Sequence, residues 1–354
     1  MKSNCIALIE IGGSHDECLL SQMSAIHSSG REVLLITFKE VYDRNKAFVP
    51  YVSDTLFVDM SGSKSQRGKE VSRIWKKLKE SNCEMAVLNT AEGNLVRLLC
   101  IKALFHKIKF VGIVHDARKF GRSFTQGIIN KKVKKYLMLS DNLVRSISPA
   151  KGLIVDYFYP LRYDTDPASI AKSTKSIVII GGVETRRKDL DGFIEMAKQV
   201  KGQNLIFTFL GKSNLELEEV QYFKKRIESD ELTGIIETFE KFVPQKIFDA
   251  TLQNANLILP LVHPNTPSAE EFFKTRMSGA MCVSFGYKIP MLLHQQFAGI
   301  EEMQAASFYY TIDTFKSSLL YALEESNLKM DQMDQNEAYN MDFQEKKYLT
   351  FLLS

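Results

Sequence analysis

The 354-residue sequence has few of the features that mark a metal site, an exported protein or a membrane span. Its five cysteines are scattered, with no Cys-x-x-Cys pair and no cysteine–histidine spacing of the zinc-binding kind. This pattern predicts reduced thiols, a cytoplasmic location and no metal. The apolar run near the start is too short for a signal peptide, and no stretch approaches transmembrane length. Any membrane contact is therefore expected to be peripheral.

Signatures of dinucleotide and nucleic-acid binding are also missing. No Gly-x-Gly-x-x-Gly motif is followed by an acidic residue at the next strand end, which argues against a dinucleotide-dependent oxidoreductase. The net charge of +4 permits anionic partners but does not predict nucleic-acid binding. With 45% hydrophobic and 25% charged residues, the composition is that of an ordinary globular protein. The length predicts two domains.

The stretch 176–200 opens the second half of the chain. Four β-branched residues at 177–180 are typical of a buried parallel strand. A glycine pair ending at Gly182 follows, and then a run of three cations that includes Arg187 and Lys188. Strand, glycine turn, cations and an amphipathic helix are typical of the start of a nucleotide-binding βαβ unit, which predicts a phosphate site here. The alternative is that these cations only form the solvated start of a helix.

Alternating strands and helices recur through both halves, which predicts α/β architecture with doubly wound parallel sheets. In the first half, strands are expected at 5–11, 33–38, 55–58, 85–88, 110–114 and 143–147. In the second half, they are expected at 177–180, 205–210, 234–239, 257–261 and 291–294. The stretch 156–176 has no periodicity and reads as a linker. We therefore expect domains at 1–158 and 174–335, with the amphipathic stretch 336–354 returning to the first domain.

Ligands of such sheets bind beyond the carboxyl ends of the strands. In the first half this rule selects Gly12, Gly13 and His15, and the adjacent pair His115 and Asp116. A histidine can donate a hydrogen bond to a sugar hydroxyl and an aspartate can accept one, so this pair is predicted to be catalytic. The other three are predicted to line the acceptor side. The alternative is that Asp116 caps a turn and His115 is a packed, hydrogen-bonded residue.

A basic cluster lies within an expected helix over 126–139. It consists of Lys131, Lys132, Lys134 and Lys135, with apolar residues between and beside them. A basic amphipathic helix can rest on anionic lipid headgroups, which predicts a peripheral membrane contact through 128–137. The alternative is a solvated helix face.

A second phosphate-binding candidate is the expected helix start at 278–280. Ser278 is a plausible N-cap, and Gly279 would let a phosphate approach the exposed amides of Gly279 and Ala280. Further candidates for donor contact flank this helix or follow other strands: Lys274, Arg276, Gly211 and Lys241. The alternative is an ordinary capped helix with surface cations nearby.

The second half resembles the donor domain of GT-B glycosyltransferases of the group 1 type, glycosyltransferase family 4. The resemblance lies in an ordered set of segments: IVIIGGVETRRKDLDGFIEMA, FTFLGKSN, FEKFVPQKIFDATLQNANLILPL and SGAMCVSFGYKIPML. The first half matches more loosely, through its first glycine turn and the pair His115 and Asp116. The resemblance implies two Rossmann-like domains facing across a cleft, with Lys188 at the position of the family's diphosphate-binding lysine.

The same resemblance implies the chemistry. The implied reaction moves a sugar from a nucleotide-diphosphate sugar to a glycan, lipid-linked or protein acceptor. The transferred sugar is expected to be a hexose. It implies retention of anomeric configuration, no metal and no cofactor other than the nucleotide sugar as co-substrate. The nucleotide sugar and the acceptor are thus the implied partners.

The chain departs from the family pattern at three positions. Val183 stands where the family often has an arginine, and Thr275 and Val283 stand where it has paired glutamates. Part of the usual ribose and sugar recognition is therefore altered or missing. This keeps open a second hypothesis, a non-catalytic GT-B subunit that binds a partner transferase or a glycan. A dinucleotide-dependent oxidoreductase ranks third.

Overall fold

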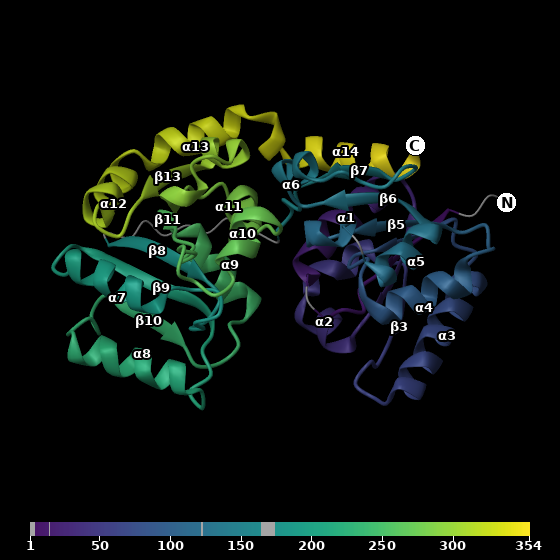
Figure 1. Ribbon diagram of the computed structural model, residues 1–354, viewed down its shortest axis with the longest axis horizontal. Coiled ribbons are helices and arrows are strands. Elements are labelled where there is room, and N and C mark those ends of the chain that lie inside the picture. The colour runs from purple at the N-terminus through teal and green to yellow at the C-terminus, as the bar shows by residue number, and fades with distance from the viewer. Residues whose placement is uncertain (1–3, 14, 122, 164–173) are drawn as a thin grey trace. The chain divides into compact units, whose positions relative to one another are not determined.

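The computed structural model describes residues 4–13, 15–121, 123–163 and 174–354 (Figure 1). The chain divides into two compact units, each with its own parallel sheet. The first unit comprises Met1–Arg162 with Met341–Ser354, and the second comprises Tyr163–Asn340. Residues 164–173 of the predicted linker over 156–176 lie outside the described residues, and its two ends overlap the last strand of the first unit and the first strand of the second. The predicted pair of Rossmann-like α/β domains is confirmed.

The first unit is built on a seven-stranded sheet of order β3-β2-β1-β4-β5-β6-β7, in which every pairing is parallel. The strands are β1 (Cys5–Ile9), β2 (Glu32–Thr37), β3 (Asp54–Phe57), β4 (Met85–Leu88), β5 (Lys109–Ile113), β6 (Val133–Met138) and β7 (Ile154–Tyr157). The helices are α1 (Leu19–Ser28), α2 (Lys39–Arg44), α3 (Lys64–Glu80), α4 (Gly93–Ala103), α5 (Phe124–Lys132), α6 (Asp141–Ser146) and α14 (Met341–Leu353). Strand β1 is buried along its whole length, as expected for an apolar run covered on both faces.

Two predicted elements of the first unit are wrong. The helix expected over 126–139 ends at Lys132, and Val133 starts strand β6, which pairs with β5. The apolar residues there fit a helix by spacing, but Tyr136 and its two apolar successors are buried in the sheet instead. The strand expected over 143–147 is helix α6, because Ser140 caps it by accepting the amide of Leu143 at 3.1 Å. The seventh strand, β7, follows it.

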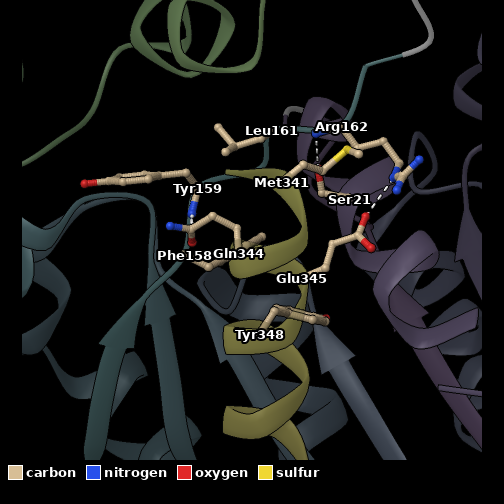
Figure 2. A pocket seen from close by; sticks show the side chains of 9 residues that line it. All are labelled: Ser21, Phe158, Tyr159, Leu161, Arg162, Met341, Gln344, Glu345 and Tyr348. Atoms are coloured by element: carbon tan, nitrogen blue, oxygen red, sulfur yellow. Dashed lines mark hydrogen bonds and ion pairs between the residues drawn. The ribbon is translucent and has the colours of Figure 1, made fainter. Parts of the chain in front are cut away.

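The C-terminal helix α14 packs on α1 of the first unit, so its predicted return is confirmed (Figure 1). Figure 2 shows its contacts: Gln344 accepts the backbone N–H of Tyr159 at 3.0 Å, and Glu345 pairs with Arg162 at 2.7 Å. The ring of Tyr348 lies 5.0 Å from that of Phe158. The cavity among these side chains is about 10 Å³, room for roughly one water molecule. It is therefore a packing gap and too small for a substrate.

The second unit is built on a six-stranded sheet of order β10-β9-β8-β11-β12-β13, again with every pairing parallel. The strands are β8 (Lys175–Ile180), β9 (Leu205–Lys212), β10 (Ile236–Phe239), β11 (Leu257–Ile258), β12 (Met291–His294) and β13 (Ser307–Tyr310). The helices are α7 (Leu190–Gln199), α8 (Glu218–Ser229), α9 (Gln245–Gln253), α10 (Ala269–Lys274), α11 (Gly279–Tyr287), α12 (Phe315–Glu324) and α13 (Ser326–Gln335). Phe193 of α7 packs edge-on against Phe207 and Phe209 of β9 at the centre of its core.

Glycines allow the ends of β8 and β9 to touch backbone to backbone. A Cβ atom on Gly182 would overlap the carbonyl oxygen of Lys212, and one on Gly211 would overlap the backbone at Gly181. Gly181 itself has a φ of 87°, a conformation that side chains other than glycine rarely adopt. Steric exclusion therefore accounts for glycine at 182 and 211, whatever ligand binds nearby.

Candidate functional site

The carboxyl edge of the second sheet holds a buried cation, Lys188, between β8 and α7. Lys188 is only 7% exposed, and burial, the largest influence on it, lowers the pKa of its ammonium group. Across the described parts of the chain, its one polar contact is with Glu184, whose Oε1 lies 3.5 Å from Nζ. An ammonium group has three hydrogen-bond donors, and this single contact is long. The site can therefore offer at least two donors to an anionic ligand.

The loop that carries Lys188 is held at several points. The N–H of Val183 donates to Ser213 Oγ at 3.0 Å, and that of Thr185 donates to Glu219 Oε2 at 2.7 Å. The carbonyl oxygen of Arg186 accepts from Ser268 Oγ at 2.7 Å. Because these contacts come from segments after β9 and β11, the loop is fixed before any ligand binds.

Arg187 lies beside Lys188 but is half-exposed. Its Nε is 3.4 Å from Glu184 Oε2, so both cations face the same carboxylate. One carboxylate cannot neutralise two cations, which leaves a local excess of positive charge. This arrangement suits a diphosphate better than a neutral ligand.

The second predicted phosphate-binding element, the start of α11, belongs to the same unit. Ser278 caps the helix, and its Oγ accepts the amide of Ala280 at 3.3 Å. A Cβ on Gly279 would meet nothing within 4 Å, so the space beside that backbone is open. Because all strands are parallel and α11 follows β11, its N-terminus lies at the same edge of the sheet as Lys188.

The remaining donor-site candidates are less favourably placed. Lys274 pairs with Glu270 at 2.7 Å and Arg276 with Glu271 at 2.9 Å, so each is already partly neutralised. Lys241 is exposed and follows the edge strand β10, which β9 separates from β8. Gly211 faces backbone rather than open space.

Three residues at this edge were not anticipated from the sequence. His263 follows β11 and is 1% exposed; its Nδ1 lies 2.7 Å from Asp189 Oδ2 and its Nε2 lies 2.6 Å from Tyr310 OH. His294, at the end of β12, is half-buried, with its ring 5.3 Å from that of His263. Burial and then the neighbouring His263 lower the pKa of His294. The one available signal was that Tyr310 and both histidines lie at or just after strand ends.

The carboxyl edge of the first sheet brings His15 and His115 together. Their rings are stacked, with centroids 3.6 Å apart and planes 5° from parallel. His115 Nε2 lies 2.7 Å from the carbonyl oxygen of Asn89, so the Nε2–H group donates there. His15 Nδ1 lies 3.2 Å from Glu17 Oε1. Burial opposes charge on His15, but the Glu17 carboxylate outweighs it and raises the pKa of His15.

A buried carboxylate, Glu10, organises this edge and was missed in the sequence. It is fully buried, and burial raises its pKa despite the hydrogen bonds that it accepts. Its Oε1 accepts the amides of Gly12 and Gly13 at 2.7 and 3.0 Å. Its Oε2 accepts Asn89 Nδ2 at 2.6 Å and Thr90 Oγ1 at 2.8 Å. The two glycine amides therefore point inward to Glu10, and the loop before His15 is anchored by it.

Asp116 takes the capping position that the sequence left open as an alternative. It is 2% exposed and accepts the amide of Arg118 at 3.0 Å, which starts the 3₁₀ turn η3 (Ala117–Phe120). The guanidinium of Arg118 also pairs with both carboxylate oxygens, at 2.6 Å for the shorter contact. Both oxygens of Asp116 are thus engaged within its own turn.

The described residues contain neither a metal-binding cluster nor a membrane-spanning helix. In them, no three histidine, cysteine, aspartate or glutamate side chains are grouped so as to hold a metal ion. Nor does any helix within them have the length and apolar character needed to span a bilayer.

The chain matches no known family model and no curated protein by sequence. Its structure resembles solved structures over nearly its whole length. HepE of Anabaena, solved with UDP and glucose, has a TM-score of 0.67 and 13% identity, covering 99% of this chain and 100% of that one. A glycosyltransferase from Rickettsia africae gives 0.68 and 12%, covering 99% of each chain.

Epimerases share the same architecture. The UDP-GlcNAc 2-epimerase from Neisseria meningitidis, solved with UDP-GlcNAc, has a TM-score of 0.60 and 10% identity, covering 99% of this chain and 98% of that one. Identities this low carry information on the fold alone. Together with the two parallel sheets and the returning C-terminal helix, these comparisons show that the chain has the GT-B fold.

Proposed function

We propose that the protein is a glycosyltransferase that moves a sugar from a nucleotide-diphosphate sugar to a glycan, lipid-linked or protein acceptor. We propose retention of anomeric configuration and no requirement for a metal or cofactor. The observation that carries the proposal is the buried ammonium of Lys188, which has one long contact in the described structure and a second cation beside it. Burying a charge is costly unless it is paired, so this site is built for an anion.

Lys188 and Arg187 are assigned to the diphosphate. When the bond from the sugar to the diphosphate breaks, negative charge grows on the leaving phosphate oxygen. Fixed cations stabilise that charge most where water is excluded, which is the situation of Lys188. The open N-terminus of α11, with Gly279, adds partial positive charge at the same edge of the sheet.

The histidine pair of the first unit is assigned to the sugar and acceptor side. The hydrogen bond from His115 Nε2 to the carbonyl oxygen of Asn89 fixes the orientation of the His115 ring. The ring of His15 stacks on that of His115, and the pKa of His15 is raised. We assign His115 a contact with the transferred sugar, whereas Asp116 orders the following turn.

UDP is the first nucleotide to test, because HepE was solved with UDP and the Neisseria epimerase with UDP-GlcNAc. Calorimetric titration of the protein with UDP, UDP-glucose, UDP-GlcNAc, GDP and NAD checks the proposal. A UDP compound should bind, and UDP should be released from the sugar nucleotide when an acceptor is supplied. Binding of NAD alone would contradict the proposal.

Two other outcomes have specific meanings. If no nucleotide binds, the result would favour the non-catalytic subunit. Thr275 and Val283, which stand in place of the family's paired glutamates, agree with that alternative. If proton NMR shows that the sugar of UDP-GlcNAc is converted when no acceptor is present, the result would instead indicate epimerase chemistry.

We also propose a cytoplasmic location, and contact with a membrane through 128–137 stays a prediction. The lysines of that segment do not form one helical face, because α5 ends at Lys132 and Lys135 lies in β6. Lys132 Nζ donates to the carbonyl oxygen of His106 at 2.7 Å, and Lys135 Nζ to that of Phe351 at 3.0 Å. Co-sedimentation with anionic vesicles at low and high salt checks this contact.

A further inference from the structure

A buried chain of three polar side chains lies directly beside Lys188. Asp189 Oδ2 is 2.7 Å from His263 Nδ1, and His263 Nε2 is 2.6 Å from the hydroxyl of Tyr310. His263 and Tyr310 are each 1% exposed. The chain joins residues that follow β8 and β11 to the end of β13.

Each ring nitrogen of His263 has one partner. The hydrogen bond from His263 is the largest influence on Asp189 and lowers its pKa, so Asp189 is a carboxylate that accepts the proton of Nδ1. Burial raises the pKa of Tyr310, so its hydroxyl keeps its proton beside Nε2. The ring of His263 is therefore held from both sides.

Asp189 links this chain to the lysine. Besides its contact with His263, it accepts the amide of Gly192 through Oδ1 at 2.9 Å and so caps helix α7. Its own N–H donates to the carbonyl oxygen of Leu261 at 2.9 Å. Asp189 is thus held through both its side chain and its backbone N–H. Because it directly follows Lys188, the direction in which the Lys188 side chain leaves the backbone is fixed.

We propose that His263 and Tyr310 are positioning residues for the diphosphate site and act on it through Asp189 and Lys188. This inference rests on the proposed function of that site. Neither residue is exposed enough to touch a ligand, so their influence must pass through the loop. A fully hydrogen-bonded buried chain adds little net stability over apolar packing, but it defines one geometry. A cation that must lie at hydrogen-bond distance from a phosphate depends on such a fixed geometry.

The variants His263→Leu, His263→Asn and Tyr310→Phe test this inference, together with Lys188→Ala and the double variant of Lys188→Ala with His263→Leu. Each is titrated with UDP by calorimetry, and its melting is followed by circular dichroism. His27→Leu is the control, because His27 is an exposed histidine on α1 of the first unit.

We expect His263→Leu to weaken UDP binding by about fivefold or more, as is usual for residues coupled in one network. His263→Asn should recover most of that loss, because an asparagine amide can still donate to Asp189. Tyr310→Phe should lose less than His263→Leu, since it leaves the contact with Asp189 in place. The double variant should bind about as weakly as Lys188→Ala, because the proposed route from His263 to the ligand runs through Lys188.

The two proposals fail in different ways. If the wild type binds no nucleoside diphosphate, both are overturned. If the wild type binds UDP and Lys188→Ala weakens it, the positioning role is overturned when His263→Leu is folded and binds like the wild type. It is equally overturned when the losses from Lys188→Ala and His263→Leu simply add. Should His263→Leu not fold, His263→Asn and Tyr310→Phe decide, and wild-type UDP affinity in both of these variants would contradict the positioning role.

Discussion

A buried ionisable group lies at the carboxyl edge of the sheet in each unit, Glu10 in the first and Lys188 in the second, and their surroundings differ in opposite ways. Glu10 of the first unit accepts four hydrogen bonds of 2.6 to 3.0 Å from its own unit. Lys188 of the second has one contact, at 3.5 Å, in the described structure. A buried charged group whose hydrogen-bonding capacity is filled by the protein serves to hold the fold together. One whose capacity is not filled can still bind a ligand.

The largest effect expected from this contrast is on ligand binding by Lys188→Ala. A hydrogen bond to a charged group contributes about 1.5–3 kcal/mol, so UDP affinity should fall roughly ten- to hundredfold. Turnover should fall at least as far, because charge on the leaving group grows in the transition state. The melting temperature should not fall, since the variant no longer buries a poorly paired charge.

Calorimetry, steady-state kinetics and thermal melts measure these quantities. Lys79→Ala is the control, because Lys79 lies exposed near the end of α3 in the first unit. If the Lys188→Ala protein melts at a lower temperature but binds UDP like the wild type, Lys188 stabilises the fold and does not bind the ligand.

The converse variant, Glu10→Gln, should affect folding instead. The amide keeps one acceptor for the glycine loop but turns an NH₂ group toward Asn89 and Thr90, which both donate there. Leaving buried donors unsatisfied costs about 1–3 kcal/mol, so the free energy of unfolding should fall by this amount in denaturant titrations. UDP affinity should be unchanged. Glu40→Gln, on the exposed face of α2, is the matched control, and equal stability of the two variants would refute the anchoring role.

A pH titration sharpens the comparison from the side of Lys188. Burial lowers the pKa of Lys188 below the usual 10.5, and only the charged ammonium attracts phosphate. From neutral pH upward, UDP affinity should therefore decline as pH rises through that lowered value, earlier than for an exposed lysine. Measuring the UDP dissociation constant from neutral pH up to the usual lysine value of 10.5 checks this. Lys188→Arg should show no decline over that range, because arginine stays charged. A decline of equal size in that variant would assign the titration to another group.

The smallest effect is expected for Asp116→Asn. Asparagine caps a turn about as well as aspartate, so the 3₁₀ turn η3 should survive, and the charge pairing with the half-exposed Arg118 is lost. Stability should fall by about 1 kcal/mol or less. Turnover should stay near the wild-type value if Asp116 only orders its turn. A loss of turnover by a hundredfold or more at unchanged stability would make it catalytic instead.

The sequence was sufficient for features that depend on neighbours along the chain. A β-branched run, a glycine turn and cations located the end of β8 and the loop of Lys188, and strand-end reasoning brought His15 and His115 to one edge. Where two periods fitted equally well, local reasoning failed. The lysines and apolar residues after Asn130 match a helix by spacing, and only the pairing with β5 makes Val133–Met138 a strand.

Partners that lie far apart in the chain could not be predicted either. Glu10 meets Asn89, and Asp189 meets His263 from 74 residues away. Such contacts exist only once the sheet order is set, because parallel strands from different parts of the chain then share one edge. The under-satisfied state of Lys188 is likewise a property of the packed loop and not of its sequence.

The backbone contacts of Gly182 with Lys212 and of Gly211 with Gly181 have a consequence for how this protein can change by mutation. Each glycine is excluded from gaining a side chain by backbone atoms, and backbone atoms are the same for every amino acid. A substitution at either position therefore has no compensating substitution at its contact partner, and a selection for second-site suppressors at the partner should return none. Glycine at these two positions would persist through any drift in substrate, and its presence in a related chain would report how β8 and β9 meet rather than which ligand is bound.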